Sequence, residues 1–290
     1  MSVTDPIPFS NGIARILSRG DLDQSEAWRH AFEGKAKDHR FYEIVADTLG
    51  ANFEHHYLSL EDRAGKVRGI QPVFFVQQNL VEGIPALRRA VEKVRQRFPR
   101  FLTMRVLMIG NAAGEGHLSA CASGDEAWMA RALHEVLGPF ARRSRASLIV
   151  FKDFPATYRG ALASLARDDF TRVPSMPMTE LPLAYRDFDH YLTTLGAATR
   201  KDLRRKFRRI AAAEPISVEV VADLTPFVEE VYPLYLQVHE RSPMKFERLT
   251  KEYLSSLGRR MPERVRFFIW RQNGKAIAFS VALLHDGTIY

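Results

Sequence analysis

The sequence predicts an α+β (α/β) fold made of two halves, each with a mixed β-sheet flanked by helices. One order of elements, a strand, two helices and a β-hairpin, begins at Ile13 and begins again at Ile216. The first strand and the hairpin are separated by 43 residues in the first half (13 to 56) and by 49 in the second (216 to 265). Similar spacing of the same elements indicates a duplicated domain.

Local patterns define the start of the first half. Ile13–Leu17 is a short apolar strand. Ser25 is a helix N-cap, and a second helix runs from Arg40 to Leu49. Two strand-like runs then flank the turn at residues 62–65, which predicts a hairpin over Tyr57–Val76.

The rest of the first half alternates helices with apolar strands. Pro85 begins an amphipathic helix, and Met104–Gly110 reads as a buried strand. After the loop Asn111–Gly116, Ser123 and Glu126 form a capping box at the start of a long helix. The remaining elements are a strand, a helix and an extended stretch containing proline: Ser147–Phe151, Tyr158–Arg167 and Phe170–Leu183.

The second half repeats the beginning of the first. Ile216–Val221 alternates like a strand, and Thr225-Pro226 starts a helix. A second helix contains Leu249, Tyr253 and Leu257, and a hairpin over Val265–Leu284 turns at Asn273-Gly274. Since Thr288–Tyr290 only begin a further strand, we expect the sheet of this half to be incomplete.

A basic helix joins the halves. Seven of the ten residues from Arg200 to Arg209 are Lys or Arg and one is Asp, which gives this segment +6 of the chain's net +8. Thr199 is the expected N-cap, and Leu203, Phe207 and Ile210 form an apolar stripe that we expect to be buried against the second half. Like charges at i and i+4 oppose such a helix by about 0.2–0.5 kcal/mol each. The sequence therefore predicts an anionic partner for the helix; the alternative is a solvated charged face.

Composition excludes several classes of protein. The 290 residues include a single cysteine, Cys121, which excludes a disulfide framework and a cysteine-based zinc site, and we expect no metal. No apolar run approaches the roughly 20 residues of a membrane span, and the first residues lack a signal-peptide pattern. We therefore expect a soluble cytoplasmic protein without a transmembrane segment, of unknown oligomeric state, whose partner is an anionic small molecule, a nucleotide phosphate, CoA, an anionic membrane surface or a nucleic acid.

The order strand, helix, helix, hairpin, strand, loop, helix, strand resembles that of the GNAT acyltransferase superfamily. Two such units, with the segment TRKDLRRKFRR leading into the second and the phrase Tyr232-Pro-Leu-Tyr…Arg241-Ser242…Phe246-Glu247 following it, are similar to the FemAB-like branch. The resemblance implies a first GNAT-like domain at residues 1–185. Residues 186–290 then form the basic helix and a partial second GNAT-like domain.

The resemblance also implies a place for the acyl donor. Members of the superfamily hold the pyrophosphate of acyl-CoA on backbone N–H groups of a glycine-containing loop, and Asn111, Gly114 and Gly116 lie at the matching positions. Asn111 departs from the Gln or Arg of the family pattern, and Glu115 adds a negative charge. The alternative is an ordinary surface loop. The guanidinium groups of the basic helix are further candidates to bind the donor: Arg200, Arg204, Arg205 and Arg208.

Candidates for the chemistry lie at the end of the helix that begins at Thr225. His239 or Glu240 would be the general base and Arg241 an anion clamp, with Tyr235 and Phe246 on the substrate side of a cleft between the halves. The alternative is that His239 only balances the helix dipole. Lys152 and Asp153 follow an apolar strand, where α/β sheets place their sites, although a salt-bridged strand exit explains them equally.

The function expected is transfer of an acyl or aminoacyl group from acetyl-CoA, another acyl-CoA or aminoacyl-tRNA to an amine by direct attack. This agrees with the lack of a nucleophile motif in the sequence. Two alternatives stay open. One is a nucleic-acid-binding protein that acts through Arg200–Arg209, and the other is a non-catalytic GNAT-like scaffold.

Overall fold

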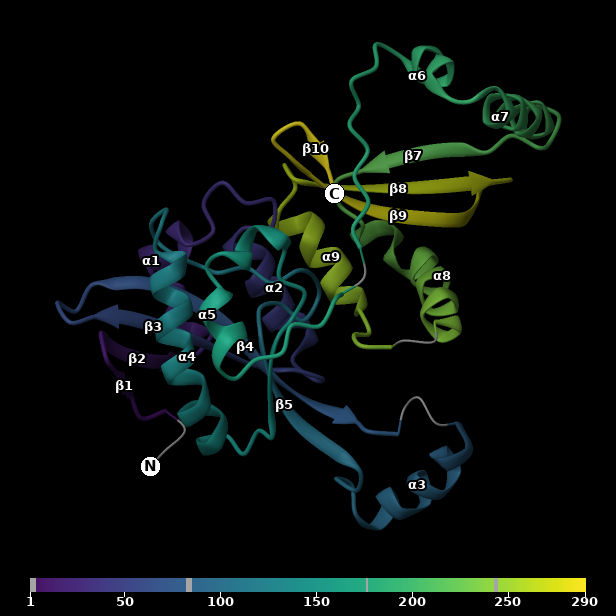
Figure 1. The fold of residues 1–290 in the computed structure, drawn as a ribbon. Coiled ribbons are helices and arrows are strands. Elements are labelled where there is room, and N and C mark those ends of the chain that lie inside the picture. The colour runs from purple at the N-terminus through teal and green to yellow at the C-terminus, as the bar shows by residue number, and fades with distance from the viewer. Residues whose placement is uncertain (1–3, 82–84, 176, 243–244) are drawn as a thin grey trace.

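A computed structural model describes residues 4–81, 85–175, 177–242 and 245–290. It contains two separate β-sheets with flanking helices, one in each half of the chain (Figure 1). The predicted fold class is therefore confirmed, and both predicted hairpins are present.

The first sheet has six strands in the order of the sequence. Neighbours are antiparallel except the last two, which are parallel, so this sheet is mixed. Its third strand pairs with the fourth only up to Glu54 opposite Phe75, so the end of the fourth strand pairs on one side only, with the fifth. The strands are β1 Ile7–Phe9, β2 Gly12–Leu17, β3 Glu54–Asp62, β4 Val67–Asn79, β5 Thr103–Ile109 and β6 Leu148–Phe151.

Helices cover both faces of the first sheet. The long helix α4 buries Leu133, Val136 and Phe140 on one face, whereas α1 and α2 pack on the other. Helix α3 lies at the outer end of the β4–β5 arm (Figure 1). The helical segments are η1 Gly20–Leu22, α1 Glu26–His30, α2 His39–Leu49, α3 Pro85–Arg97, α4 Glu126–Arg143, η2 Ala156–Arg159 and α5 Ala163–Asp168.

The N-terminal cap of α1 was predicted correctly, but that of α4 was not. Ser25 caps α1 by accepting a hydrogen bond from the backbone N–H of Trp28. The capping box proposed for α4 does not form, because the N-cap is Asp125 rather than Ser123. Glu126 instead accepts a hydrogen bond from the N–H of Gly124.

The second sheet has the order β10-β9-β8-β7 and is antiparallel throughout the described residues, so the prediction of a mixed second sheet was wrong. Its last strand pairs with the second strand of the hairpin, as expected from Thr288–Tyr290. Leu249 precedes the helix that was predicted to contain it. The elements are β7 Ser217–Val221, η3 Thr225–Phe227, α8 Val228–Arg241, α9 Lys251–Arg260, β8 Val265–Gln272, β9 Lys275–His285 and β10 Thr288–Ile289.

The two halves share one hydrophobic core, built around α2 and α9. These helices occupy the same position in the element order of each half, and they run antiparallel. The Thr250 hydroxyl at the start of α9 donates to the Thr48 carbonyl near the end of α2 (3.3 Å), while Arg40 at the start of α2 donates to the Arg260 carbonyl at the end of α9 (2.9 Å). Phe41 and Tyr253, each three residues after its helix N-cap, meet edge to face at 6.4 Å. Equivalent positions thus contact each other, as around a local two-fold axis.

Half-buried ion pairs surround this helix pair. Arg260 of α9 reaches Glu43 and Asp47 of α2, at 2.7 Å each. Arg40 pairs with Glu263, and Arg264 lies 3.3 Å from Asp38. These partly shielded charge pairs hold the halves in one relative position more firmly than fully solvated pairs would.

The basic helix stands apart from this core. Helices α6 (Phe188–Thr194) and α7 (Ala197–Ala211) form an arm beyond the edge strand β7, on the side away from the first half (Figure 1). The N-cap of α7 is Gly196, not Thr199, and none of its residues is buried. The prediction of a buried stripe was therefore wrong: Phe207 is 40% and Ile210 61% exposed. The stripe gives α7 an apolar side, but no sheet face lies against it.

Candidate active site between the two halves

A cleft of about 590 Å³ opens between the halves, at the base of the β4–β5 arm. It lies where β4 continues past the end of β3, so the half-paired edge of β4 forms part of its wall. The first half contributes residues 50–54 and 75–77 together with Arg105. The second half contributes His239, Lys245, Phe246 and Arg248.

An aromatic cluster forms one side of the cleft. The ring of Phe246 lies 5.5 Å from Phe53 and 6.4 Å from Phe74. The ammonium group of Lys152, directly after β6, lies 5.2 Å from the centroid of the Phe246 ring. Phe246 therefore anchors a loop of the second half on the sheet of the first, and it gives the cleft an apolar surface.

Two tyrosines of α8 hold this loop. The Tyr232 hydroxyl donates to the Leu249 carbonyl (2.9 Å), and the Leu249 N–H donates to the Tyr235 hydroxyl (2.8 Å). Burial raises the pKa of Tyr235, so its phenol stays neutral. The Tyr235 ring also lies 5.7 Å from the ring of His239. Tyr235, expected at the substrate, thus positions the loop and does not line the cleft itself.

The cleft carries an excess of positive charge. Arg105, Lys245 and Arg248 face one carboxylate, Glu54. Glu54 accepts a hydrogen bond from Arg105 at 2.6 Å, and the guanidinium group lies 4.3 Å from the centroid of the Phe75 ring. Burial raises the pKa of Glu54, but hydrogen bonds from His56 and Arg105 outweigh that effect and lower it overall. Lys245 and Arg248 have no acidic partner among the described residues, and together with the apolar floor they suit a ligand with phosphate groups and an apolar chain.

The glycine loop Asn111–Gly116 follows β5, as expected, but it does not line the cleft. Lys37 forms an ion pair with Glu115, and Lys152 donates to the Gly114 carbonyl at 3.1 Å. Burial raises the pKa of Glu115, but Lys37 outweighs that effect and lowers it. The negative charge that counted against phosphate binding is therefore neutralised by a residue of the same chain.

The glycines and the asparagine of this loop have defined surroundings. A Cβ atom at Gly116 would lie 2.3 Å from the Phe154 ring. The backbone N–H of Gly116 donates to the Asp153 carbonyl at 3.1 Å. Asn111 is buried; its Oδ1 accepts from the Ala113 N–H, and its Nδ2 has no partner among the described residues. The loop is compact, and Lys152, which donates to it, also contacts Phe246 at the cleft.

The structure does not bring the basic helix to this cleft, so the arginines named as candidates to bind the donor do not line it. Arg200 donates to the carbonyls of Thr193 and Leu195 at 3.0 Å each and thus caps α6. Arg205 pairs with Asp202 at 2.5 Å. Arg204 and Arg208 are exposed. The local sequence specified the helix, but its position depends on the connections on either side of it.

Of the other candidates, His239 and Phe246 lie at the cleft, while Glu240 and Arg241 are exposed beyond it on the last turn of α8. Sequence reasoning missed Lys245, Arg248 and Arg105, although a charge within the apolar strand β5 was a visible signal. It also missed Glu247 as a functional group. Burial raises the pKa of Glu247, with Lys152 and His239 near enough to oppose this.

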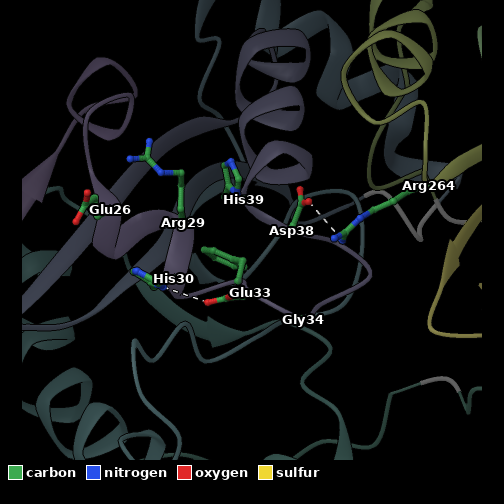
Figure 2. Close-up of a pocket in the computed structure, with 9 residues that line it drawn as sticks. Glu26, Arg29, His30, Glu33, Gly34, Asp38, His39 and Arg264 are labelled. Atoms are coloured by element: carbon green, nitrogen blue, oxygen red, sulfur yellow. Dashed lines mark hydrogen bonds and ion pairs between the residues drawn. The ribbon is translucent and has the colours of Figure 1, made fainter.

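A second hollow, of about 430 Å³, lies where the turn between α1 and α2 meets Arg264 at the start of β8 (Figure 2). Two ion pairs lie in it: Arg264 is 3.3 Å from Asp38, and His30 is 3.1 Å from Glu33. Burial lowers the pKa of His39. Its lining has three carboxylates (Glu26, Glu33 and Asp38) against the guanidinium groups of Arg29 and Arg264, so this hollow attracts an anionic donor less than the cleft at His239 does.

Comparison with known families gives a match for the segment that supplies one wall of this cleft. Residues 197–290 match the family model described as Acetyltransferase (GNAT) domain. The matched segment contains α7, α8, α9 and the second sheet, including His239, Lys245, Phe246 and Arg248. The GNAT match supports acyl transfer as the general reaction and N-acyltransferase as the class of enzyme. GNAT domains generally use acyl-CoA. A comparison of the whole chain with curated proteins found no match.

In the described part of the chain, no helix is both long enough and apolar enough to cross a membrane. The His, Cys, Asp and Glu residues of that part form no group of three or more that would hold a metal ion.

Proposed function

We propose that this protein is an N-acyltransferase whose reaction takes place in the cleft between its halves. It would transfer an acyl or aminoacyl group from an acyl-CoA thioester to an amine. The observation that carries the proposal is the position of His239, Lys245, Phe246 and Arg248: they lie within the GNAT-matched segment and face the first sheet across a cationic cleft.

Each wall of the cleft has a role in this proposal. Lys245 and Arg248 bind the phosphates of the donor, because ammonium and guanidinium groups form strong charge-assisted hydrogen bonds to them. Phe246 and Phe53 contact the apolar part of the donor. Arg105 is already paired with Glu54, so it orders the cleft wall and adds to its field.

The chemical step needs one proton acceptor and no covalent enzyme intermediate. His239 removes a proton from the acceptor ammonium, since an imidazole nitrogen at the cleft can act as a general base. The neutral amine nitrogen attacks the thioester carbonyl, the new C–N bond forms and the C–S bond breaks. The thiolate of CoA then leaves and takes up the proton held by His239, while the nitrogen releases its remaining extra proton to water and becomes a neutral amide. Most of the acceleration comes from holding amine and thioester together.

We further propose that residues 1–185 and 186–290 form a tandem pair of GNAT-like domains of the FemAB-like kind. The repeated element order and the contact of α2 with α9 at equivalent positions support this. In such a pair each half closes the other's open side. Asn111, Gly114 and Gly116 would then be a remnant of a donor loop in the first half, filled by Lys37 and Phe154.

The proposal is tested by following release of free CoA thiol from a panel of acyl-CoA donors with a panel of amines. We expect turnover by the wild type and a 10²- to 10⁴-fold loss of kcat in His239→Ala, the range typical of a general base. Lys245→Ala with Arg248→Ala should raise the KM for the donor. Lys275→Ala, on the exposed turn of the second hairpin, is the matched control and should behave as wild type.

Three results would contradict the proposal. Equal turnover in wild type and His239→Ala would exclude His239 as the base. CoA binding without turnover for any amine would identify a non-catalytic scaffold. Turnover with aminoacyl-tRNA alone, and no response to any acyl-CoA, would move the donor class away from CoA.

A further inference from the structure

The α6–α7 arm combines a dense positive charge with exposed apolar side chains. Helix α7 contains seven basic residues and one acidic residue between Arg200 and Arg209. Phe207 and Ile210 on α7 are 40% and 61% exposed, and Phe188 on α6 is 57% exposed. The centroids of the Phe188 and Phe207 rings lie 5.7 Å apart in an edge-to-face contact, so the two helices present one apolar patch.

The described part of the chain balances only a part of this charge. Asp202 pairs with Arg205 and Lys206, but it is the only acidic residue of the helix. The other five basic residues of α7 have no acidic partner among the described residues: Arg200, Lys201, Arg204, Arg208 and Arg209. With no buried residue to stabilise it, and with like charges one turn apart, α7 gains from an external anionic surface.

We propose that the α6–α7 arm lies on the surface of a membrane rich in anionic phospholipid. Leu203, Phe207 and Ile210 share one stripe of the helix, with Arg204 on one side of it and Arg209 on the other. In this orientation the apolar stripe enters the boundary between headgroups and acyl chains, and the cationic groups reach lipid phosphates on both sides. This surface is separate from the cleft and does not depend on the acyl-transfer reaction.

A membrane suits this arm better than a nucleic acid does. A nucleic acid would satisfy the arginines and lysines through its phosphates but would leave Phe207 and Ile210 in water. An anionic membrane takes both the charge and the apolar groups. The two partners therefore differ in how they respond to removal of the apolar groups alone.

The test is flotation of the full chain with vesicles of phosphatidylcholine and phosphatidylglycerol, with pure phosphatidylcholine vesicles and a single-stranded RNA measured in parallel. We expect binding to the anionic vesicles only, weakening as salt shortens the screening length. Arg204→Glu with Arg208→Glu should weaken vesicle binding more than tenfold, since each basic residue near such a surface contributes roughly fivefold in affinity. Phe207→Ser with Ile210→Ser should weaken it several-fold.

Matched controls separate the arm from the rest of the surface. Arg159→Glu with Arg167→Glu reverses two exposed charges of the first half, and Val238→Ser removes an apolar side chain of α8 that is 70% exposed. Both should bind vesicles as the wild type does. Thermal unfolding without vesicles should be unchanged in Phe207→Ser, Ile210→Ser.

The proposal is overturned by any of three results. If the protein does not bind anionic vesicles, a membrane is excluded as the partner of the arm. If it binds RNA tightly and the Phe207→Ser, Ile210→Ser variant binds RNA equally well, α7 is assigned to nucleic acid. A clear fall in melting temperature of the serine variant without vesicles would show that the stripe packs against the protein itself.

Discussion

A glycine in the last turn of α9 gives the sharpest prediction for the packing within the second half. A Cβ atom at Gly258 would lie 2.5 Å from the Ala222 carbonyl oxygen, 2.9 Å from the Cα atom of Asp223 and 3.3 Å from the Phe267 ring. In an open helix, replacing glycine with alanine stabilises by about 0.8–1 kcal/mol. At Gly258 the nearby carbonyl oxygen of Ala222 should make the same substitution destabilising.

The expected magnitude follows from two opposing effects. Overpacking a well-packed site costs about 1–3 kcal/mol, and a backbone atom cannot rotate away as a flexible side chain can, so the cost lies at or above the upper end of that range. After the gain in helix propensity, Gly258→Ala should destabilise by about 2 kcal/mol. At about 2–4 °C per kcal/mol, the melting temperature should fall by about 4–8 °C.

Calorimetry or dye-monitored thermal unfolding measures this shift. Gly160→Ala is the control, because Gly160 has helical φ and ψ of −65° and −50° and no neighbouring atom within 4 Å of the added Cβ. It should melt within about 1 °C of wild type. A melting temperature of Gly258→Ala equal to or above that of wild type would refute the close packing of α9 against the Ala222–Asp223 turn.

Three further changes test the junction of the halves. Arg40→Ala should destabilise by about 1–3 kcal/mol in urea unfolding. Arg40 also lowers the pKa of Glu263, so this stabilisation is present at neutral pH and lost as the pH falls through the depressed pKa, and the variant should lose less stability in acid. Tyr235→Phe leaves the Leu249 N–H without its acceptor and should cost about 1–2 kcal/mol while raising the KM for the donor. Burial raises the pKa of Glu247, so wild-type stability should fall as the pH rises through that pKa, and a pH series of Glu247→Gln should lack this fall.

The elements of the fold were largely predictable because their signals are local. Alternating apolar residues around Asn273-Gly274 define the second hairpin, whose turn has positive φ at both of these residues. The N-cap Ser25 and the helix ending at Leu49 were also found from sequence. The N-cap of α7 was wrong because a glycine three residues earlier adopts the cap conformation, and no side-chain signal marks it.

The site was less predictable because it depends on contacts between distant segments. Phe246 belongs to the phrase that resembles the family, and His239 was identified from its place at the end of a predicted helix; both lie at the cleft. Arg105 is far from them in sequence, and only the packing of α2 on α9 brings its strand opposite the loop of the second half. The position of α7 was wrong for a related reason. Periodicity predicts a helix with an apolar side, but it does not say what covers that side.

Hydrogen–deuterium exchange with and without an acyl-CoA most directly tests the claim that the reaction takes place between the halves. The account predicts that the donor slows exchange at residues 50–54 and 245–249, the backbone on the two sides of the cleft, and leaves residues 197–211 unchanged. Protection confined to 197–211 or to 111–116, with none at the cleft, would contradict it.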